Sequence, residues 1–416
     1  MRVLTRPAAA LALVTASALA TLSLPAPPAS ADPTRDDSWH VKELELAELH
    51  RITQGEGVVV AVVDTGVDAS HRDLKDNVLP GVDLYDRDGK GDVDRRNHGT
   101  GMASLIAGHG HGPGNGNGVL GVAPKAKILP VTVQNEQARA ISPEAIATGI
   151  NWAVDHGADI INVSLGGSFS DELNRAVERA YQQDIIVVAA IGNDDNYVAG
   201  FPAQHELAVA VNGTDRKGVI SKGAALAADE VDIAAPGEQI VLAVPGDKYE
   251  TSTGSSSSAA LVSGSLALIK ARYPDLNAQQ LVQRLLETTR DAGDPGHDRQ
   301  YGWGVLDLRQ ALIGEPDGRT APSASASAAP PTANLEAWQT DPGERENGIL
   351  IAVWAAIIVV FLLLVGGIVA LLLRRRARQR QTRPADDTPS LAAAAGSGPG
   401  QPADTPDDTV WRRPAT

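Results

Sequence analysis

Three short stretches of the chain hold residue types that together could carry out nucleophilic hydrolysis. They lie at 64–68, 98–101 and 254–264, and they supply Asp64, His98 and a run of four serines, Ser255 to Ser258. A carboxylate can orient an imidazole, an imidazole can take and return a proton near neutral pH, and a hydroxyl can attack a carbonyl carbon. Each stretch alone is better explained as a turn aspartate, a loop histidine or a serine-rich helix start. The chemistry therefore depends on whether the fold brings them together.

The neighbouring residues predict which elements position these groups. Asp64 directly follows the apolar run 58–63, His98 leads into an apolar stretch that ends at Ala107, and the serine run opens a helix that reaches about Tyr273. A hydroxyl at a helix start lies at the positive end of the helix dipole, which favours developing negative charge. We therefore expect one group at the end of a strand and two at helix starts.

Short apolar runs alternate with helical patterns through the middle of the chain. The runs lie at 58–63, 128–133, 160–163, 185–190 and 207–211. Their nearly continuous hydrophobicity is typical of strands covered on both faces. Capping residues predict helix starts at Ser142, Ser170 and Asn277. We expect an α/β domain with a mostly parallel sheet, helices on both faces and the functional site beyond the carboxyl ends of the strands.

Both ends of the chain are interpreted as targeting segments. Residues 1–31 have a basic start, an Ala/Leu-rich stretch and a small-residue cleavage pattern, which is typical of a signal peptide, although a buried helix is the alternative. Residues 348–373 form an uncharged run of 26, long enough to cross a ~30 Å hydrocarbon core. Five arginines follow between Arg374 and Arg380, and such charge marks the cytoplasmic side. We expect a single-pass cell-membrane protein with an extracytoplasmic domain and a disordered cytoplasmic tail at 374–416.

Composition excludes several other functions. The 416 residues include 36 basic and 51 acidic ones, a net charge of −15, which argues against nucleic acid as a partner. No cysteine is present, so disulfides, thiolate metal sites and a cysteine nucleophile are excluded.

No organic cofactor is needed and no metal is assigned. Asp86, Asp88 and Asp92 form a faint calcium pattern, but a solvated acidic loop is the better interpretation. A metal site formed by His98, His109 and His111 is a weak hypothesis, because the glycines near these histidines leave the ligand geometry undefined.

Taken together, the three stretches resemble the subtilisin-type serine proteases over roughly 57–308, and the chain order Asp–His–Ser is the subtilisin order. Val262 and Gly264 set the register of the family's serine motif, so the resemblance implies Ser256 as the nucleophile, with Ser255 and Ser257 as minor candidates. It also implies that Asp64 orients His98, and that His98 is the general base. Ser255 replaces the family's threonine and Ala260 its proline.

The same resemblance implies further site residues. Asn193, in the segment 189–193, is expected to be the oxyanion-hole donor together with the Ser256 backbone N–H. Ser164, Leu165 and Gly166 are expected to pair with the substrate backbone, in the manner of a peptide added to a sheet edge. The implied substrates are proteins or peptides.

The whole architecture resembles the mycosins, the actinobacterial membrane-anchored proteases of type VII secretion systems. It consists of a signal peptide at 1–31, an extension at 32–55, a peptidase domain at 56–313, a Pro/Ala/Ser-rich linker at 314–347 and one membrane span. The extension is expected to pack along the protease through Trp39 and three leucines. The resemblance implies cleavage of secreted or cell-surface proteins and association with the secretion complex. Two alternatives remain open, a subtilase-like scaffold with little or no activity and a surface protease unrelated to secretion.

Overall fold

The computed structural model describes residues 32–134, 141–193, 199–224 and 226–316. The expected signal peptide, the expected membrane span at 348–373 and the tail lie outside the described residues, as does nearly all of the expected linker. Among the described residues, no helix has both the length and the apolar character needed to cross a bilayer.

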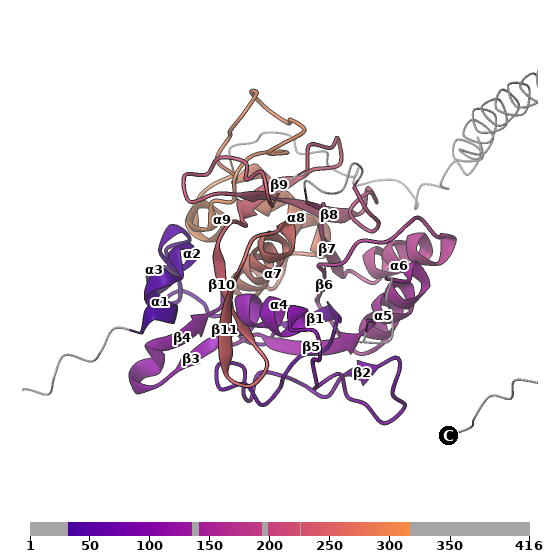
Figure 1. Cartoon of the computed structure of the whole chain (residues 1–416). Helices are drawn as coiled ribbons and strands as arrows, with labels where there is room; N and C mark the ends of the chain where they lie inside the picture. The colour runs from indigo at the N-terminus through magenta and orange to yellow at the C-terminus, as the bar shows by residue number, and fades with distance from the viewer. Residues whose placement is uncertain (1–31, 135–140, 194–198, 225, 317–416) are drawn as a thin grey trace, which may run out of the picture. The chain divides into compact units, whose positions relative to one another are not determined.

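A parallel sheet of seven strands forms the centre of the described part (Figure 1). In spatial order its strands are β2 (Val82–Asp83), β5 (Lys127–Thr132), β1 (Val59–Asp64), β6 (Ile160–Val163), β7 (Ile186–Ala190), β8 (Ala208–Thr214) and β9 (Ile233–Pro236). Every neighbouring pair is parallel. The parallel α/β sheet predicted from the apolar runs is therefore confirmed, and Asp64 is the last residue of its strand.

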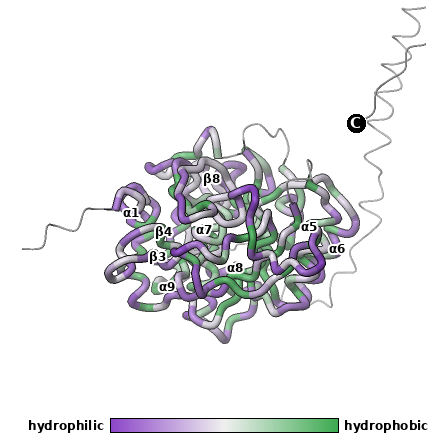
Figure 2. The backbone as a smooth tube through the Cα atoms, turned by 60° about the horizontal axis from the view of Figure 1, so that its bottom comes forward, coloured by the Kyte–Doolittle hydropathy of each residue, from purple (hydrophilic) through white to green (hydrophobic). Residues whose placement is uncertain are grey.

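Helices cover both faces of this sheet. One face carries α4 (His98–Ala107) and α7 (Ser255–Arg272), with α8 (Ala278–Glu287) and α9 (Leu308–Ile313) packed against α7; the other face carries α5 (Pro143–Asp155) and α6 (Asp171–Gln182). Alternate residues of β1 point to opposite faces of the sheet. Val60 and Val62 therefore pack in the core under α4 and α7, whereas Ala61 and Val63 pack in the core under α5 and α6. Hydrophilic residues predominate along the outer loops (Figure 2).

Side-chain caps fix three of the helix starts as the sequence predicted. Ser142 accepts a hydrogen bond from the Ala145 N–H, and Ser170 accepts one from the Leu173 N–H. Asn277 and Gln280 form a reciprocal capping box at the start of α8. These caps satisfy N–H groups that have no partner within the helix.

Two hairpins were not predicted. One joins β3 (His109–His111) to β4 (Asn117–Leu120) through a short 3₁₀ turn at Pro113–Asn115, and the other joins β10 (Ile240–Val244) to β11 (Lys248–Ser252). The first is glycine-rich and the exposed β11 is mostly polar, so neither shows the alternation by which a strand is recognised. Their stability comes from contacts with distant segments.

The extension at 32–55 is built into this fold, as expected. It forms α1 (Pro33–Asp37), α2 (Trp39–Glu43) and α3 (Leu46–Leu49), and Leu44, Leu46 and Leu49 are buried in the same core as α4 and α7. Truncating a leucine so buried costs about 2–5 kcal/mol. The segment is therefore part of the hydrophobic core.

Polar contacts also fix the extension. The indole N–H of Trp39 donates to the Glu238 carbonyl, 3.1 Å away, and the Arg35 guanidinium donates to the Gly118 carbonyl at 2.9 Å. Arg309 pairs with Glu45 and Glu48. His40 is completely buried and neither ring nitrogen has a partner among the described residues, and this burial lowers its pKa to about 4.

Candidate active site

The structure brings Asp64 and His98 together although 34 residues separate them. The Nδ1 atom of His98 lies 2.9 Å from both carboxylate oxygens of Asp64. Asp64 is fully buried, whereas the His98 side chain is 34% exposed. With Nδ1–H donating to the carboxylate, the other ring nitrogen is free to accept a proton.

The surroundings of His98 favour its charged form. Burial is the largest single influence and lowers the pKa, but the charge of Asp64 and its hydrogen bond more than offset it. Asp94 adds a smaller upward effect and Arg96 opposes it. The net result is a pKa above the ordinary histidine value, because the negative charge and hydrogen bond of Asp64 stabilise the imidazolium.

The four serines at the start of α7 differ in their surroundings. Ser255, Ser257 and Ser258 are fully buried, whereas Ser256 is partly exposed. The Ser255 hydroxyl donates to the Gly192 carbonyl, and the Ser258 hydroxyl lies within hydrogen-bond distance of the carbonyls of residues 235 and 236. The Ser257 hydroxyl has no partner among the described residues. Ser256 is therefore the serine of the run that a substrate can reach.

Two reciprocal hydrogen bonds place Ser256 at the end of β6. The Ser256 hydroxyl donates to the Ser164 carbonyl at 3.1 Å, and the Ser164 hydroxyl donates to the Ser256 carbonyl at 3.0 Å. Because β6 pairs with β1, which ends at Asp64, and α4 packs against α7, these groups gather at one edge of the sheet. This is where side chains that follow parallel strands meet.

Asn193 lies beyond the end of β7, the next strand in the sheet. Its side-chain oxygen accepts from the Ser255 N–H at 2.9 Å, which leaves the amide nitrogen without a partner among the described residues. Ser256 is the second residue of α7, so its own N–H has no acceptor within the helix. Two donors are thus available beside the Ser256 hydroxyl, as an oxyanion hole requires.

A cavity of about 680 Å³ opens beside Ser256 and Asn193. Its walls are built mainly from small and uncharged residues, and they include Ser164, Gly166, Gly167, Ala190, Gly192, Ala199, Gly200 and Gln204. Among the described residues, no lining residue is charged and none comes from the extension at 32–55. A buried charge without a partner is costly, so this cavity suits an uncharged side chain.

The structure separates the side chains of some predicted site residues. Ser164 and Gly166 line the cavity, whereas the Leu165 side chain is buried in the core on the α5 and α6 face, because alternate residues along an extended chain face opposite ways. The pairing of these three residues with a substrate backbone stays a prediction.

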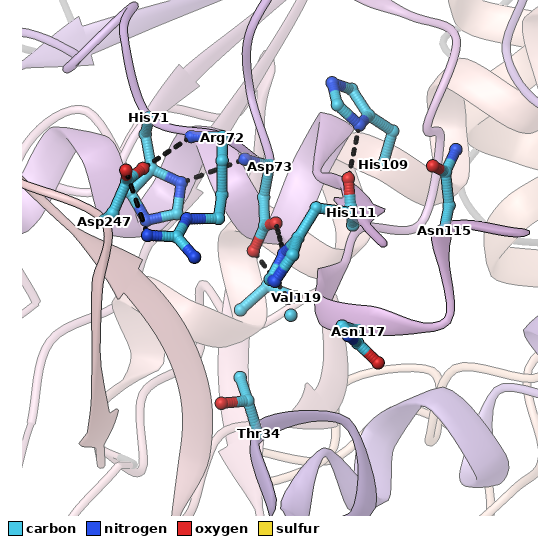
Figure 3. A network of polar contacts seen from close by, with 12 residues as sticks. Thr34, His71, Arg72, Asp73, His109, His111, Asn115, Asn117, Val119 and Asp247 are labelled. Carbon is cyan, nitrogen blue, oxygen red and sulfur yellow. Dashed lines mark hydrogen bonds and ion pairs between the residues drawn. The ribbon is translucent and has the colours of Figure 1, made fainter. Parts of the chain in front are cut away.

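His109 and His111, considered above as metal ligands together with His98, lie in the β3–β4 hairpin. The Nδ1 atom of His111 is hydrogen-bonded to Asp73 (Figure 3). In the described ranges, no three histidine, aspartate or glutamate side chains are grouped to hold a metal ion.

Sequence reasoning missed other residues of this site. Gly200 and Gln204 lie between β7 and β8 in the chain, and nothing in the neighbouring sequence predicts that they line a cavity. Asp94, four residues before His98, is buried against the first turn of α4 and accepts five hydrogen bonds. The sequence offered no signal for it, since acidic residues are frequent in that loop.

Comparison with known proteins agrees with this geometry. The model of the subtilase family matches residues 55–304. The chain belongs to the subtilase family. Among the curated relatives of this subtilase is subtilisin DY of Bacillus licheniformis, which is 36% identical over 272 residues, a match that covers 62% of the chain and 92% of the relative. The subtilase is therefore a serine endopeptidase with the subtilisin-like α/β fold.

Solved structures place the subtilase near a narrower group. MycP1, described as an essential component of the type VII (ESX-1) secretion system, matches with a TM-score of 0.60 and 31% identity over 69% of this chain and 90% of that one. MycP1 from Mycobacterium smegmatis matches with a TM-score of 0.58 and 28% identity over 70% and 89%. The similarity to a mycosin expected from the architecture is thus found in the fold as well.

Proposed function

We propose that this subtilase is a membrane-anchored endopeptidase that cleaves secreted or cell-surface proteins outside the membrane, in association with a type VII secretion complex. One observation carries the catalytic part. The only partly exposed serine of the run at 255–258 is bonded to the end of β6, beside the strand whose last residue holds His98. That arrangement suits a nucleophile and its base.

The proposed reaction forms an acyl-enzyme. The Ser256 Oγ attacks the scissile carbonyl carbon while its proton passes to Nε2 of His98, and Asp64 stabilises the resulting imidazolium. The tetrahedral intermediate collapses as His98 returns the proton to the leaving amine, which leaves an ester on Ser256. Water, deprotonated by His98, then hydrolyses the ester and restores the serine.

The oxyanion of the intermediate is proposed to bind between the Asn193 amide nitrogen and the Ser256 N–H. The Ser255 N–H holds the Asn193 oxygen and so keeps the amide nitrogen pointed away from it. Because the donors are fixed before the reaction, little reorganisation is needed when the charge develops. The substrate side chain enters the uncharged cavity beside Gly166.

The Ser256 hydroxyl must turn before it can react. It donates to the Ser164 carbonyl in this structure, and rotation about its Cα–Cβ bond redirects it toward His98. Catalytic hydrogen bonds in enzymes without substrate are often poorly aligned and tighten only in the complex. A peptide bound along residues 164–166 would supply the contacts that favour the rotation.

Fluorophosphonate labelling of the full chain, purified in mild detergent, tests the catalytic proposal. We expect labelling that disappears in Ser256→Ala and persists in Ser257→Ala. The second substitution is a matched control because the Ser257 hydroxyl is buried and unpartnered among the described residues. Labelling that survives in Ser256→Ala would assign the nucleophile to another residue.

The scaffold alternative has one structural observation in its favour, which is the Ser256 hydroxyl turned toward Ser164. Ser255 and Ala260, which replace residues of the family motif, are both buried in α7. A total lack of labelling in a folded wild-type chain at every pH tried would favour a scaffold over an enzyme.

The membrane orientation can be tested because the chain has no cysteine. A single cysteine placed by Ser327→Cys, before the expected span, should react with a membrane-impermeant maleimide on intact cells. Ser397→Cys, after the span, should react only once the membrane is permeabilised. The reverse pattern, or equal reaction of both, would contradict the proposed topology.

Association with a secretion complex rests on the similarity to MycP1 and on the expected architecture. Purification of the tagged full chain from detergent-solubilised membranes should recover subunits of a type VII secretion channel. Recovery of the protease without any such subunit would favour a surface protease unrelated to secretion.

A further inference from the structure

Asp94 is a buried carboxylate next to the catalytic pair with no part in the reaction proposed above. It lies on the loop before α4 and is 6% exposed. Burial raises its pKa despite the hydrogen bonds that it accepts. A charge held in this way is expensive, so its position calls for an explanation.

The Asp94 carboxylate joins two segments that carry catalytic residues. One oxygen accepts from the Thr65 hydroxyl at 2.9 Å, and Thr65 is the residue after Asp64. The other oxygen accepts from the N–H and the hydroxyl of Thr100, at 2.9 and 2.7 Å, two residues after His98. A single side chain therefore ties the end of β1 to the first turn of α4.

The same contacts replace a missing helix cap. Asn97, the cap residue of α4, has a left-handed backbone with a φ of 71° and makes no side-chain cap bond. The first-turn donors are satisfied from outside instead, with the Gly99 N–H bonded to the Thr65 hydroxyl at 2.9 Å and the Thr100 N–H bonded to Asp94. The N–H groups of Arg96 and Asn97 also donate to Asp94. The start of α4, and with it His98, is held by these bonds.

Close backbone packing makes the linkage rigid. A Cβ atom on Gly99 would lie 2.1 Å from the Gly66 carbonyl oxygen, so only glycine allows α4 to approach the turn after Asp64 this closely. The Thr65 N–H in turn donates to Asp64 at 2.7 Å. The hydrogen-bonded path thus runs from Asp94 through Thr65 to the carboxylate that orients His98.

We propose that Asp94 is a positioning residue, which holds Asp64 and His98 in register and adds a second negative charge that stabilises the imidazolium formed during catalysis. The charged groups that act on His98 are Asp64 and Asp94, which favour the imidazolium, and Arg96, which opposes it. This inference rests on the proposed function, because it needs His98 to act as the base.

Asp94→Asn in the full chain is the main test. The substitution keeps the shape but removes the charge, and it places an amide donor against the N–H donors that Asp94 now satisfies. We expect kcat to fall roughly 10- to 100-fold, the loss that a small misplacement of catalytic groups can cause. We also expect the acid limb of the kcat/KM profile to move to lower pH, since the imidazolium loses a stabilising charge.

Asp73→Asn is the matched control. Asp73 is likewise a buried carboxylate that accepts a backbone N–H, here together with a bond from His111, but it lies outside the candidate site. It should lose stability without a shift of the pH profile. An Asp94→Asn enzyme with a wild-type pH profile and a kcat no lower than that of Asp73→Asn would overturn the inference.

A second pair of variants covers the case in which Asp94→Asn fails to fold. Thr65→Val removes the hydroxyl that links Asp94 to the turn and to Gly99, whereas Thr65→Ser keeps it. We expect Thr65→Val to lower kcat about tenfold or more and Thr65→Ser to restore it. Equal kcat values for the two would overturn the inference. A wild-type chain that neither hydrolyses peptides nor labels would instead refute the proposed function.

Discussion

The described part of the chain holds two pairs of a buried aspartate and a histidine, and one of the two lies beside the candidate nucleophile. Asp64 and Asp73 are both fully buried, and each accepts from Nδ1 of a partly exposed histidine, His98 at 2.9 Å and His111 at 2.6 Å. In each pair the carboxylate also accepts a backbone N–H, from Thr65 and from Val119 respectively. By the pair geometry alone the two could not be told apart.

The difference lies in what surrounds each histidine. The strand β6, which pairs with the strand that ends at Asp64, leads to Ser164, and there lie the Ser256 hydroxyl, the start of α7 and the proposed oxyanion donors. The second pair (Figure 3) lies among the β3–β4 hairpin, the Tyr249 hydroxyl and His71, whose Nδ1 accepts from the Asp73 N–H. It links three segments, and none of its residues lines the cavity beside Ser256. An aspartate–histidine pair is therefore a structural device until a nucleophile and an anion site are added.

Substituting the two aspartates should give the largest contrast. Asp64→Asn is expected to lower kcat by about 10⁴, the loss seen when the aspartate of such a triad becomes an amide, because the wrong histidine tautomer is then favoured. Asp73→Asn should leave kcat within about twofold of wild type. Steady-state kinetics on a peptide substrate measures both, and similar losses in the two variants would contradict the distinction drawn here.

The anion site gives the next largest effect. Asn193→Ala should lower kcat by roughly 10²–10³ with little change in KM, a magnitude taken from the equivalent asparagine in subtilisin. Asn212→Ala is the control, since Asn212 is buried and bonded to the loop carbonyls of Leu226 and Gln300. It should reduce thermal stability and leave kcat unchanged. If KM rather than kcat changed in Asn193→Ala, its role would be in ground-state binding.

The second pair should act on stability instead. His111→Asn leaves the Asp73 carboxylate buried with a weaker partner, which is expected to cost about 2 kcal/mol of unfolding free energy. Denaturant unfolding at neutral pH measures this loss, and labelling by a fluorophosphonate should be unchanged. A fall in labelling rate without a loss of stability would mean that the two pairs are coupled.

The pH dependence of the first pair is the subtlest difference. The pKa of His98 is raised, so its neutral, base-competent form is lost as the pH falls through a value above the ordinary histidine pKa. In Asp64→Asn the acid limb of the residual activity should move to lower pH. The charged imidazolium also stabilises the folded state, and this contribution has the opposite pH dependence to the activity. It is fully present below the unfolded-state pKa of His98 and is lost as the pH rises through the folded-state pKa. An unchanged acid limb in Asp64→Asn would contradict this assignment.

Local sequence signals predicted the framework of the domain because they depend on nearby residues. The capped starts at Ser142, Ser170 and Asn277 appear as predicted, and the apolar runs become strands β1, β5, β6, β7 and β8, with β6 at the predicted bounds and the other ends within three residues of them. A strand with apolar residues on both faces and a serine at a helix start are each visible within a few residues. The edge strand β9 was not among the predicted strands.

The rest depends on contacts between distant segments. The exposure of Ser256 beside three buried serines follows from how α7 meets β6 and β7, and this could not be obtained from four identical letters. Asp94 and Asp73 are both plain acidic residues in loops, and only the fold shows which one adjoins His98. The resemblance implied that the backbone of residues 164–166 pairs with a substrate, and it did not indicate that the Leu165 side chain packs in the core on the α5 and α6 face.

The way in which the extension at 32–55 is incorporated bears on how such an enzyme is kept in check. Many proteases are stored as zymogens, with a removable plug in the cleft. Here that stretch supplies leucines to the interior and no wall of the cavity. Removing it would therefore destabilise the domain and would take away none of the described residues that line the cavity. The described extension is thus a part of the domain and not a removable plug of this cavity.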